Sequence, residues 1–206
     1  AIGRCFEEAL QKAIRMLDIG KPGLVASNIT DRKVLEPRLR EITDEVIFDI
    51  AAALKMGFTV EEISRLTSID PWFIEKVKNI VDMEEKLKSL RGKTLDEIAD
   101  VIKEAKRLGF SDKQIAMCLG ITEDEVRRFR YKKGIVPVVK QIDTLAAEWP
   151  ASTNYLYVTY GGDEDDIEFR KDIKKVIVLG AGTYRIGSSV EFDWCTMNMV
   201  LSLIHI

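Results

Sequence analysis

The chain has 206 residues, of which 46% are hydrophobic and 32% are charged, and its formal net charge is −3. This length accommodates one large or two small domains, and the balanced charge excludes a strong global field toward nucleic acid or an anionic membrane. Three widely spaced cysteines form no disulfide framework or paired metal motif, and no apolar run reaches the roughly 18 residues that cross a bilayer, so we expect a reducing, cytoplasmic setting.

The first predicted element is an amphipathic helix over residues 5–17. The side chains expected on its apolar face are Phe6, Leu10, Ala13, Ile14 and Leu17. Glycine and proline at residues 20–23 end this helix, and residues 18–33 are predicted to form a loop. The early acids exclude a secretory signal peptide. Because the chain starts without methionine, we interpret it as a piece of a longer protein.

A duplicated helical pattern occupies residues 42–132. The segments Gly57–Thr59 and Gly109–Ser111 each end one helix and begin the next, at an offset of 52 residues (109 − 57). The same offset pairs Asp44 with Asp96, Glu45 with Glu97, Ile50 with Ile102, Ala53 with Ala105, Ile63 with Ile115 and Ile69 with Ile121. We therefore predict two copies of one unit, at 42–80 and 94–132, each with a longer helix, a short helix and a third helix.

Capping residues set the predicted helix boundaries. The pairs with capping-box spacing are Thr59 with Glu62, Thr94 with Glu97, Ser111 with Gln114, and Thr122 with Glu125. Asp70 precedes Pro71, and proline suits the first helical position. Gly109, Gly120 and Gly134 are predicted to end helices, because glycine adopts the left-handed conformation that a helix C-terminus often requires.

The pattern changes after residue 134. Residues 135–140 and 155–159 are rich in β-branched and aromatic side chains and are predicted to be extended, with an acidic connection over 161–174. Residues 175–179 are a continuous apolar run, typical of a strand buried on both faces of a parallel sheet, and a helix is predicted from about residue 188 or 190. One strand and one helix cannot form a sheet, so we expect this α/β part to be incomplete.

Three glycines follow the predicted strand at 175–179: Gly180, Gly182 and Gly187. One interpretation is a dinucleotide-binding fingerprint, in which backbone N–H groups face a pyrophosphate. That fingerprint requires a glycine at the position of Arg185. We therefore favour a tight strand-to-helix turn that needs small residues, and keep a nicotinamide-dependent oxidoreductase only as an alternative.

Residues 109–134 have the spacing of a DNA-binding helix-turn-helix. Against this interpretation, the recognition helix would begin with Glu123, Asp124 and Glu125, which repel phosphate. Basic residues gather at its C-terminal end, where cations suit the helix dipole in any case: Arg127, Arg128, Arg130, Lys132 and Lys133. A helix-turn-helix regulator is the second hypothesis for the function.

Other sites have little support in the sequence. His205 is the only histidine and the second-last residue, which disfavours a histidine-activated nucleophile. The acidic segment 163–168 lacks the spacing of an EF-hand loop and is interpreted as a solvated linker. Four aromatic residues at helix starts fit either the core or an interface with a partner subunit, and both alternatives stay open. They are Phe58, Trp72, Phe73 and Phe110.

Two segments carry a specific family resemblance: TLAAEWPASTNYLYVTY at 144–160 and RIGSSVEFDWC at 185–195. With AIGRCFEEALQKAIRML at 1–17 and SIDPWFIEKVKNIVDMEEKL at 68–87, the chain resembles the large subunit of glutamine-hydrolysing carbamoyl phosphate synthetase. The likeness covers nearly all of the chain, although the final residues, LSLIHI, depart from the family pattern.

The resemblance implies a mainly α fold. Residues 1–24 would be the tail of the first, carboxyphosphate-forming ATP-grasp half, and 35–150 the helical oligomerization domain with its two repeated units. Residues 151–206 would be a linker and the truncated first strand and helix of an α/β pre-ATP-grasp domain. The chain would act as a scaffold between two catalytic halves. The implied partners are a glutaminase small subunit and other copies of the large subunit, with no nucleic acid and no membrane.

In that family, bicarbonate, glutamine-derived ammonia and two ATP give carbamoyl phosphate for arginine and pyrimidine biosynthesis. The resemblance places the ATP and Mg²⁺ (or Mn²⁺) sites outside this chain, for which we predict no catalytic residue, cofactor or metal. Unstable intermediates travel through an interior tunnel that excludes water. The resemblance makes Arg185, Ser189 and Glu191 tunnel-wall candidates, with Glu8 as a further one. Ser188 and Ser189 stand where many members have Gln-Gly, which bears on the local width of the tunnel.

Overall fold

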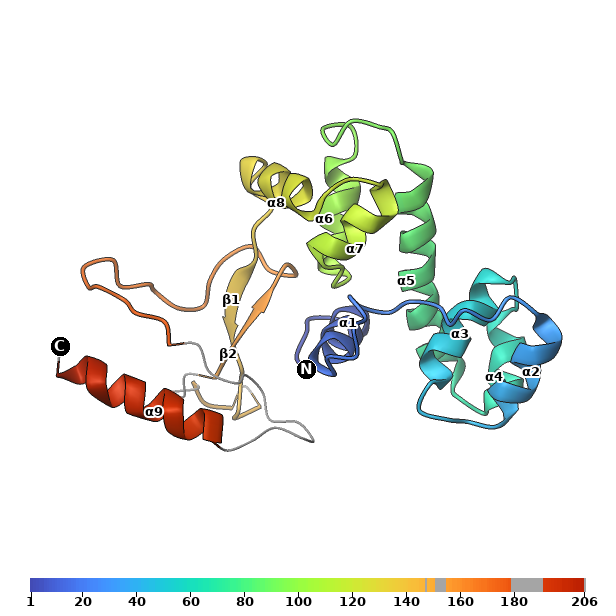
Figure 1. Cartoon of the computed structure of the whole chain (residues 1–206), viewed down its shortest axis with the longest axis horizontal. Helices are drawn as coiled ribbons and strands as arrows, with labels where there is room; N and C mark the ends of the chain where they lie inside the picture. Colours follow the sequence, from blue (N-terminus) through green and yellow to red (C-terminus); the bar gives the residue numbers. More distant parts are fainter. Residues whose placement is uncertain (147, 151–154, 179–190, 206) are drawn as a thin grey trace. The chain divides into compact units, whose positions relative to one another are not determined.

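A computed structural model describes residues 1–146, 148–150, 155–178 and 191–205 of the chain. These residues divide into two compact units, Ala1–Ile167 and Glu168–Ile206, which are treated separately below. Helices dominate the described residues, with a single two-stranded sheet (Figure 1). The predicted mainly α fold is therefore confirmed.

The helical part of the first unit begins with α1 (Phe6–Met16) and α2 (Arg32–Arg40). A first copy of the repeat follows, made of α3 (Val46–Lys55), α4 (Val60–Thr67) and α5 (Pro71–Ser89). The second copy is made of α6 (Ala99–Arg107), α7 (Asp112–Leu119) and α8 (Glu123–Lys132). The long helix α5 runs between the other helices of the first copy and α7 of the second (Figure 1).

The duplication predicted from the sequence is present in the structure. Helices α4 and α7 begin 52 residues apart (112 − 60), and so do α5 and α8 (123 − 71). Equivalent side chains are buried in the two copies: Ile50 and Ile102, Ala53 and Ala105, Phe58 and Phe110, Ile63 and Ile115. The buried apolar side chains form one core that extends through both copies.

The predicted caps are present at the helix ends. Complete capping boxes join Thr59 to Glu62, Ser111 to Gln114 and Thr122 to Glu125. Asp70 accepts a hydrogen bond from the backbone N–H of Trp72 at 2.8 Å, with Pro71 at the first helical position. Gly109, Gly120 and Gly134 have φ of +85°, +74° and +69°, as their role at helix ends requires. The fourth predicted pair, Thr94 with Glu97, is also in contact, because the backbone N–H of Thr94 donates to the Glu97 carboxylate at 2.8 Å. This contact lies in a turn, and α6 begins only at Ala99.

Helix α2 is absent from the sequence-based prediction, which gave residues 18–33 as loop and started the helical pattern at 42. Pro37 lies inside α2, where its ring removes a backbone donor and ordinarily argues against a helix. The helix forms because Leu35 and Leu39 are both fully buried, and because Asp31 caps its start by accepting from the N–H of Lys33. Tertiary burial therefore overrides a weak local preference.

The predicted helix over 5–17 is confirmed as α1, but its predicted apolar face is confirmed only in part, because Ile14 is buried and Leu10 packs against the core while Leu17 is exposed. The fully buried side chains are Glu7, Glu8, Gln11 and Ile14, whereas Leu17 is 59% exposed. Phe6, Leu10 and Ala13 are only half-buried. The inward face of α1 is polar because it meets backbone carbonyls and hydroxyls of the second copy and of a strand, which supply hydrogen bonds.

Strands β1 (Val138–Gln141) and β2 (Leu156–Thr159) form an antiparallel pair, in a register that places Val138 opposite Thr159. Both begin within or beside the segments predicted as extended. The carboxylate of Asp166 accepts hydrogen bonds from the side chain of Lys140 at 2.7 Å and from the N–H of Gln141 at 2.9 Å. The connection after β2 thereby returns along β1.

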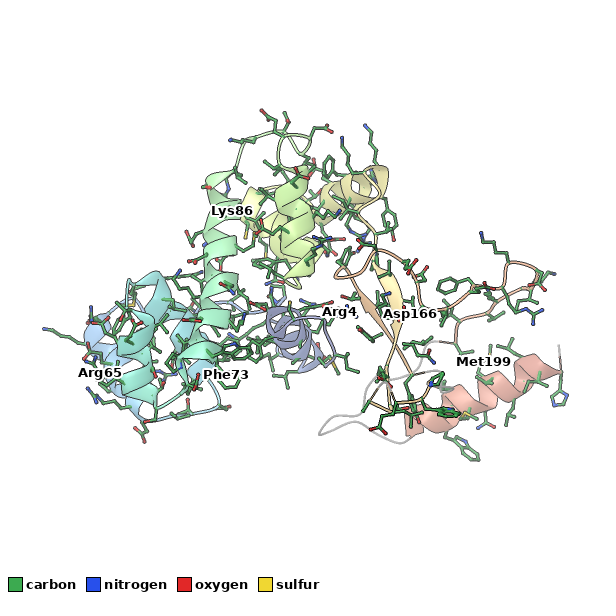
Figure 2. The ribbon with its side chains drawn as sticks, turned by 180° about the vertical axis from the view of Figure 1, so that it is seen from behind. Arg4, Arg65, Phe73, Lys86, Asp166 and Met199 are labelled. Carbon is green, nitrogen blue, oxygen red and sulfur yellow. The ribbon has the colours of Figure 1, made fainter. Side chains whose placement is uncertain are left out.

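In the unit Glu168–Ile206, the predicted C-terminal helix is present as α9 (Glu191–Ile204). Residues 175–178 of the predicted strand are not a strand, and Leu179 lies outside the described residues. A strand needs a neighbour that supplies hydrogen bonds, and no described segment pairs with 175–178. Large apolar side chains of α9, such as Trp194 and Met199, are exposed (Figure 2).

Candidate functional site

Most of the predicted site residues cannot be placed. Gly180, Gly182, Arg185, Gly187 and Ser189 lie outside the described residues. Glu191 is the first residue of α9, and nothing further is described for it. The tunnel-wall role that the resemblance implies for these residues therefore stays a prediction, as does the dinucleotide alternative. The remaining candidate, Glu8, is described in full.

Glu8 is buried on the inward face of α1. One carboxylate oxygen accepts from the backbone N–H of Arg4 at 2.7 Å and from the hydroxyl of Thr159 at 2.9 Å. The other oxygen forms an ion pair with Lys12 at 2.8 Å. Glu8 therefore ties the start of α1 to the end of β2, across 151 residues of sequence.

Gly109 explains how α1 comes so close to the second copy. A Cβ at this position would lie 2.8 Å from the Cα of Glu8, closer than real Cβ contacts. The carbonyl of Gly109 accepts a hydrogen bond from Arg15 at 2.9 Å. Glycine thus meets two requirements, a positive φ at the end of α6 and close backbone approach to α1.

The amide of Gln11 links three segments below α1. Its nitrogen donates to the carbonyl of Leu108 at 3.2 Å, and its oxygen accepts from the N–H of Leu24 at 3.1 Å and from the amide of Gln114 at 2.8 Å. All of these contacts are between residues far apart in the sequence. Gln11 therefore fixes the loop after α1 against the second copy.

A buried charge cluster lies beside this contact. Asp112, at the start of α7, accepts from Lys106 at 2.8 Å and from Arg130 at 2.8 Å, and all three side chains are buried. Burial by itself would raise the pKa of the Asp112 carboxyl, but the hydrogen bonds and charges of Lys106 and Arg130 outweigh it and hold the pKa below its ordinary value. Both cations also lie over the ring of Tyr160, at 4.7 and 5.8 Å.

Sequence reasoning missed this cluster. Lys106 and Arg130 carry no motif, and Asp112 reads as an ordinary acid in the first turn of a helix. One signal in the sequence could have pointed to the cluster, namely a difference between the two copies. At the offset of 52 residues, Asp112 and Arg130 correspond to Val60 and Lys78, so the first copy lacks the central carboxylate. The two copies therefore differ where the charge cluster forms.

Three of the five basic residues of the helix-turn-helix hypothesis form ion pairs within the chain. Arg130 is buried against Asp112, Arg127 pairs with Glu123 at 3.1 Å, and Lys133 pairs with Asp96. These contacts leave less free positive charge for a phosphate backbone than the sequence suggested. Together with the acidic start of α8, they argue against DNA recognition.

The structure separates the four aromatic residues whose location was open. Phe58 and Phe110 are buried at equivalent places in the two copies. Trp72 and Phe73 are 48% and 45% exposed, and with Phe6 they form a surface cluster with ring centroids 5.0–5.5 Å apart. Phe73 points from α5 toward α1 (Figure 2). At the equivalent place the second copy has Asp124 and Glu125, so the exposed aromatic pair is specific to the first copy.

Comparison with known families gives the identity of this arrangement. Residues 1–134 match the family described as "Carbamoyl-phosphate synthetase large chain, oligomerisation domain". The chain belongs to the carbamoyl-phosphate synthetase large-chain family. Residues 172–205 match a second description, "Carbamoyl phosphate synthase preATP-grasp domain". The resemblance noted in the sequence is thereby confirmed, and the repeated helices are those of the oligomerisation domain.

Curated relatives match almost the whole chain. The "Carbamoyl phosphate synthase large chain" of Sulfolobus acidocaldarius is 48% identical over 97% of this chain and 19% of its own length. The "Multifunctional protein CAD" of Squalus acanthias is 52% identical over 98% of the chain and 9% of its own length. The mitochondrial "Carbamoyl-phosphate synthase [ammonia]" of Mus musculus is 48% identical over 98% of the chain and 14% of its own length. The chain thus spans less than a fifth of the length of these relatives.

The described residues lack two features, a membrane-spanning helix and a cluster of metal ligands. None of their helices is long and apolar enough to cross a membrane. Within the same residues, no group of three or more His, Cys, Asp or Glu side chains is placed to hold a metal ion.

Proposed function

We propose that this chain is the central segment of a carbamoyl phosphate synthetase large chain. In this proposal the whole enzyme makes carbamoyl phosphate from bicarbonate, glutamine-derived ammonia and two ATP in the cytoplasm, and binds a glutaminase small subunit. ATP and Mg²⁺ (or Mn²⁺) act at sites outside this segment. The segment itself is a scaffold that holds two catalytic halves in register and joins copies of the large chain.

The observation that carries this proposal is the order of the two family matches in one chain. Oligomerisation-domain residues 1–134 are followed by preATP-grasp residues 172–205, so the helical domain directly precedes the start of a catalytic unit. A relative named "Carbamoyl-phosphate synthase [ammonia]" also matches, so the nitrogen source needs its own test. Assay of the full-length large chain with glutamine and with ammonium salts, before and after addition of a glutaminase small subunit, decides this. Activity with ammonium salts but none with glutamine when the small subunit is present would contradict the glutaminase partner.

A scaffold without an active site predicts that the 206-residue chain has no catalytic turnover. We expect no bicarbonate-dependent ATP hydrolysis by the purified chain, because the nucleotide sites of the proposed enzyme lie on other segments. The measurement is release of inorganic phosphate with and without bicarbonate. Turnover that depends on bicarbonate would show that the chemistry is at least partly here.

Self-association is the activity that the isolated chain should retain. Large exposed apolar side chains lie at the start of α5, at Trp72 and Phe73, and around α2, at Val34 in its first turn and at Ile42 just after its end. Exposed apolar side chains that gather on a soluble domain mark candidate interfaces, and aromatic ones contribute most to binding. We propose that one of these two surfaces contacts a second copy of the chain.

Sedimentation velocity over a range of concentrations tests the proposal. We expect a dimer or larger assembly, and replacement of the contacting pair by serine should weaken it by about tenfold or more, as loss of interface hot spots does. The two variants are Trp72→Ser with Phe73→Ser, and Val34→Ser with Ile42→Ser. Met117→Ser is the matched control, because Met117 is an equally exposed apolar residue on α7. A chain that stays monomeric at every concentration would contradict a self-associating scaffold.

A further inference from the structure

A cavity of about 320 Å³ lies within the unit Ala1–Ile167, where α1, the starts of α7 and α8 and the end of β2 meet. Its volume is in the range of about 300–1,000 Å³ that is typical of small-molecule sites. Four cations line it: Lys12 and Arg15 of α1, Lys106 of α6 and Arg127 of α8. Neither the sequence motifs nor the proposed scaffold role gives this cavity a function.

Two of these cations are neutralised within the chain. Lys12 pairs with Glu8 at 2.8 Å, and Arg127 pairs with Glu123 at 3.1 Å. Glu8 and Glu123 also line the cavity, so each pair adds no net charge to it. The charge of the cavity is therefore set by the remaining groups.

The remaining groups carry a surplus of positive charge. Lys106 pairs with Asp112 at 2.8 Å, and both line the cavity, so this pair adds no net charge either. Arg15 forms no ion pair with any described residue; its Nη1 donates to the carbonyls of Gly109 and Pro22, at 2.9 and 3.5 Å. Four cations and three carboxylates line the cavity, so the surplus is one positive charge (4 − 3), held in a partly buried site where water and salt screen it less than at the surface.

We propose that this cavity binds a small oxyanion of the phosphate class, with Arg15 as its main ligand. A planar guanidinium binds two phosphate oxygens at once, and among the described residues only Nη1 of Arg15 is engaged, by the carbonyls of Pro22 and Gly109. The surplus of one positive charge favours an anion over a neutral ligand. Lys106 and Arg127, on two other walls, complete the cationic surround. The inference goes beyond the scaffold role and does not depend on self-association.

Isothermal titration of the 206-residue chain with inorganic phosphate, at constant ionic strength set by NaCl, tests the site. We expect saturable binding of one phosphate per chain, and Arg15→Gln should weaken it by about tenfold or more, as loss of a charge-assisted bidentate contact does. Arg91→Gln is the matched control. Arg91 also donates to backbone carbonyls, those of Met117 and Cys118, but it lies outside this cavity. Its loss should leave phosphate binding unchanged.

A second variant keeps the test independent of folding. Arg127 is half-exposed on α8, so Arg127→Gln should fold even if Arg15→Gln does not, and it should weaken phosphate binding several-fold. Thermal unfolding followed by circular dichroism checks both variants. No saturable binding by the unaltered chain, or unchanged binding by a folded variant, overturns the proposal. Acetate that binds as tightly as phosphate would overturn the assignment to phosphate. Sedimentation tests the proposed self-association, whereas titration tests phosphate binding, so a negative result in one experiment leaves the other proposal standing.

Discussion

Asp112 is the residue on which the second copy depends most. Its carboxylate is the shared acceptor of two buried cations, Lys106 and Arg130, that come from α6 and α8. A buried ion pair contributes little net stability compared with apolar packing, but removal of one partner leaves charge without compensation. The cluster therefore joins α6, α7 and α8 through one carboxylate.

We predict that Asp112→Asn destabilises the chain by about 3–5 kcal/mol, because two buried cations lose their carboxylate. Urea denaturation followed by circular dichroism measures the change. The matched control is Asp82→Asn, which removes an exposed pair with Lys78 on α5 and should cost less than about 1 kcal/mol. Similar losses in the two variants would contradict a buried cluster.

The pH dependence of stability provides an independent check on the same residue. The pKa of Asp112 is lower in the folded chain than in the unfolded chain, so its stabilising effect is fully present above the ordinary carboxyl pKa. It is lost as the pH falls through the folded-state value. We expect Asp112→Asn to lose less stability than the unaltered chain when the pH falls through this acid range. A parallel decline in both proteins would be inconsistent with a lowered pKa.

At the scale of elements, the duplicated unit provides a pair of equivalent turns. Gly57 and Gly109 both have positive φ, +84° and +85°, and each ends the first helix of its copy. Nothing lies within 4 Å of a Cβ built on Gly57, whereas a Cβ on Gly109 would meet the backbone of Glu8 at 2.8 Å. The two glycines thus share a conformation but differ in their surroundings.

We predict that Gly57→Ala costs about 1–2 kcal/mol, the penalty of a left-handed conformation for an L-residue. Gly109→Ala should cost about 1–3 kcal/mol more, because α1 must also move away from the turn. Urea denaturation of both variants gives the comparison. Equal losses would show that α1 does not approach Gly109 closely.

The same scale shows where sequence reasoning succeeded. Helix starts at Thr59, Ser111 and Thr122 were predictable because a cap depends on side chains within three residues of the backbone that they bind. Helix α2 was not predictable, because its stability depends on burial of Leu35 and Leu39 by helices further along the chain. The prediction of a strand over 175–178 was wrong because a strand requires a hydrogen-bonded neighbour, and the local sequence pattern does not show whether one is present.

At the scale of the helical part of the first unit, α5 joins the two copies. It contacts α3 and α4 of the first copy and α7 of the second, and the buried core is continuous through them. A helix that packs against both copies should make their unfolding cooperative. The two copies are therefore expected to behave as one folding unit.

We predict that Ile80→Ala, at a buried position of α5, lowers stability by about 2–5 kcal/mol through the cavity that it creates. Amide hydrogen exchange should then become faster in α3 and in α7 alike. Lys78→Ala, at an exposed position of the same helix, is the control and should change neither. Faster exchange confined to one copy would contradict cooperative unfolding.

The sequence by itself determined the repeat, its offset and the chain's family. Apolar spacing and helix caps depend on interactions between residues that are close in the sequence, so the repeat could be recognised without the fold. The family was recognised from two long segments that resemble it. Only the tertiary structure decided which face of α1 is buried, and that Arg15, Lys106 and Asp112 line one cavity. Polar side chains can be buried only where distant groups complete their hydrogen bonds and charges, and those groups meet only when the chain has folded.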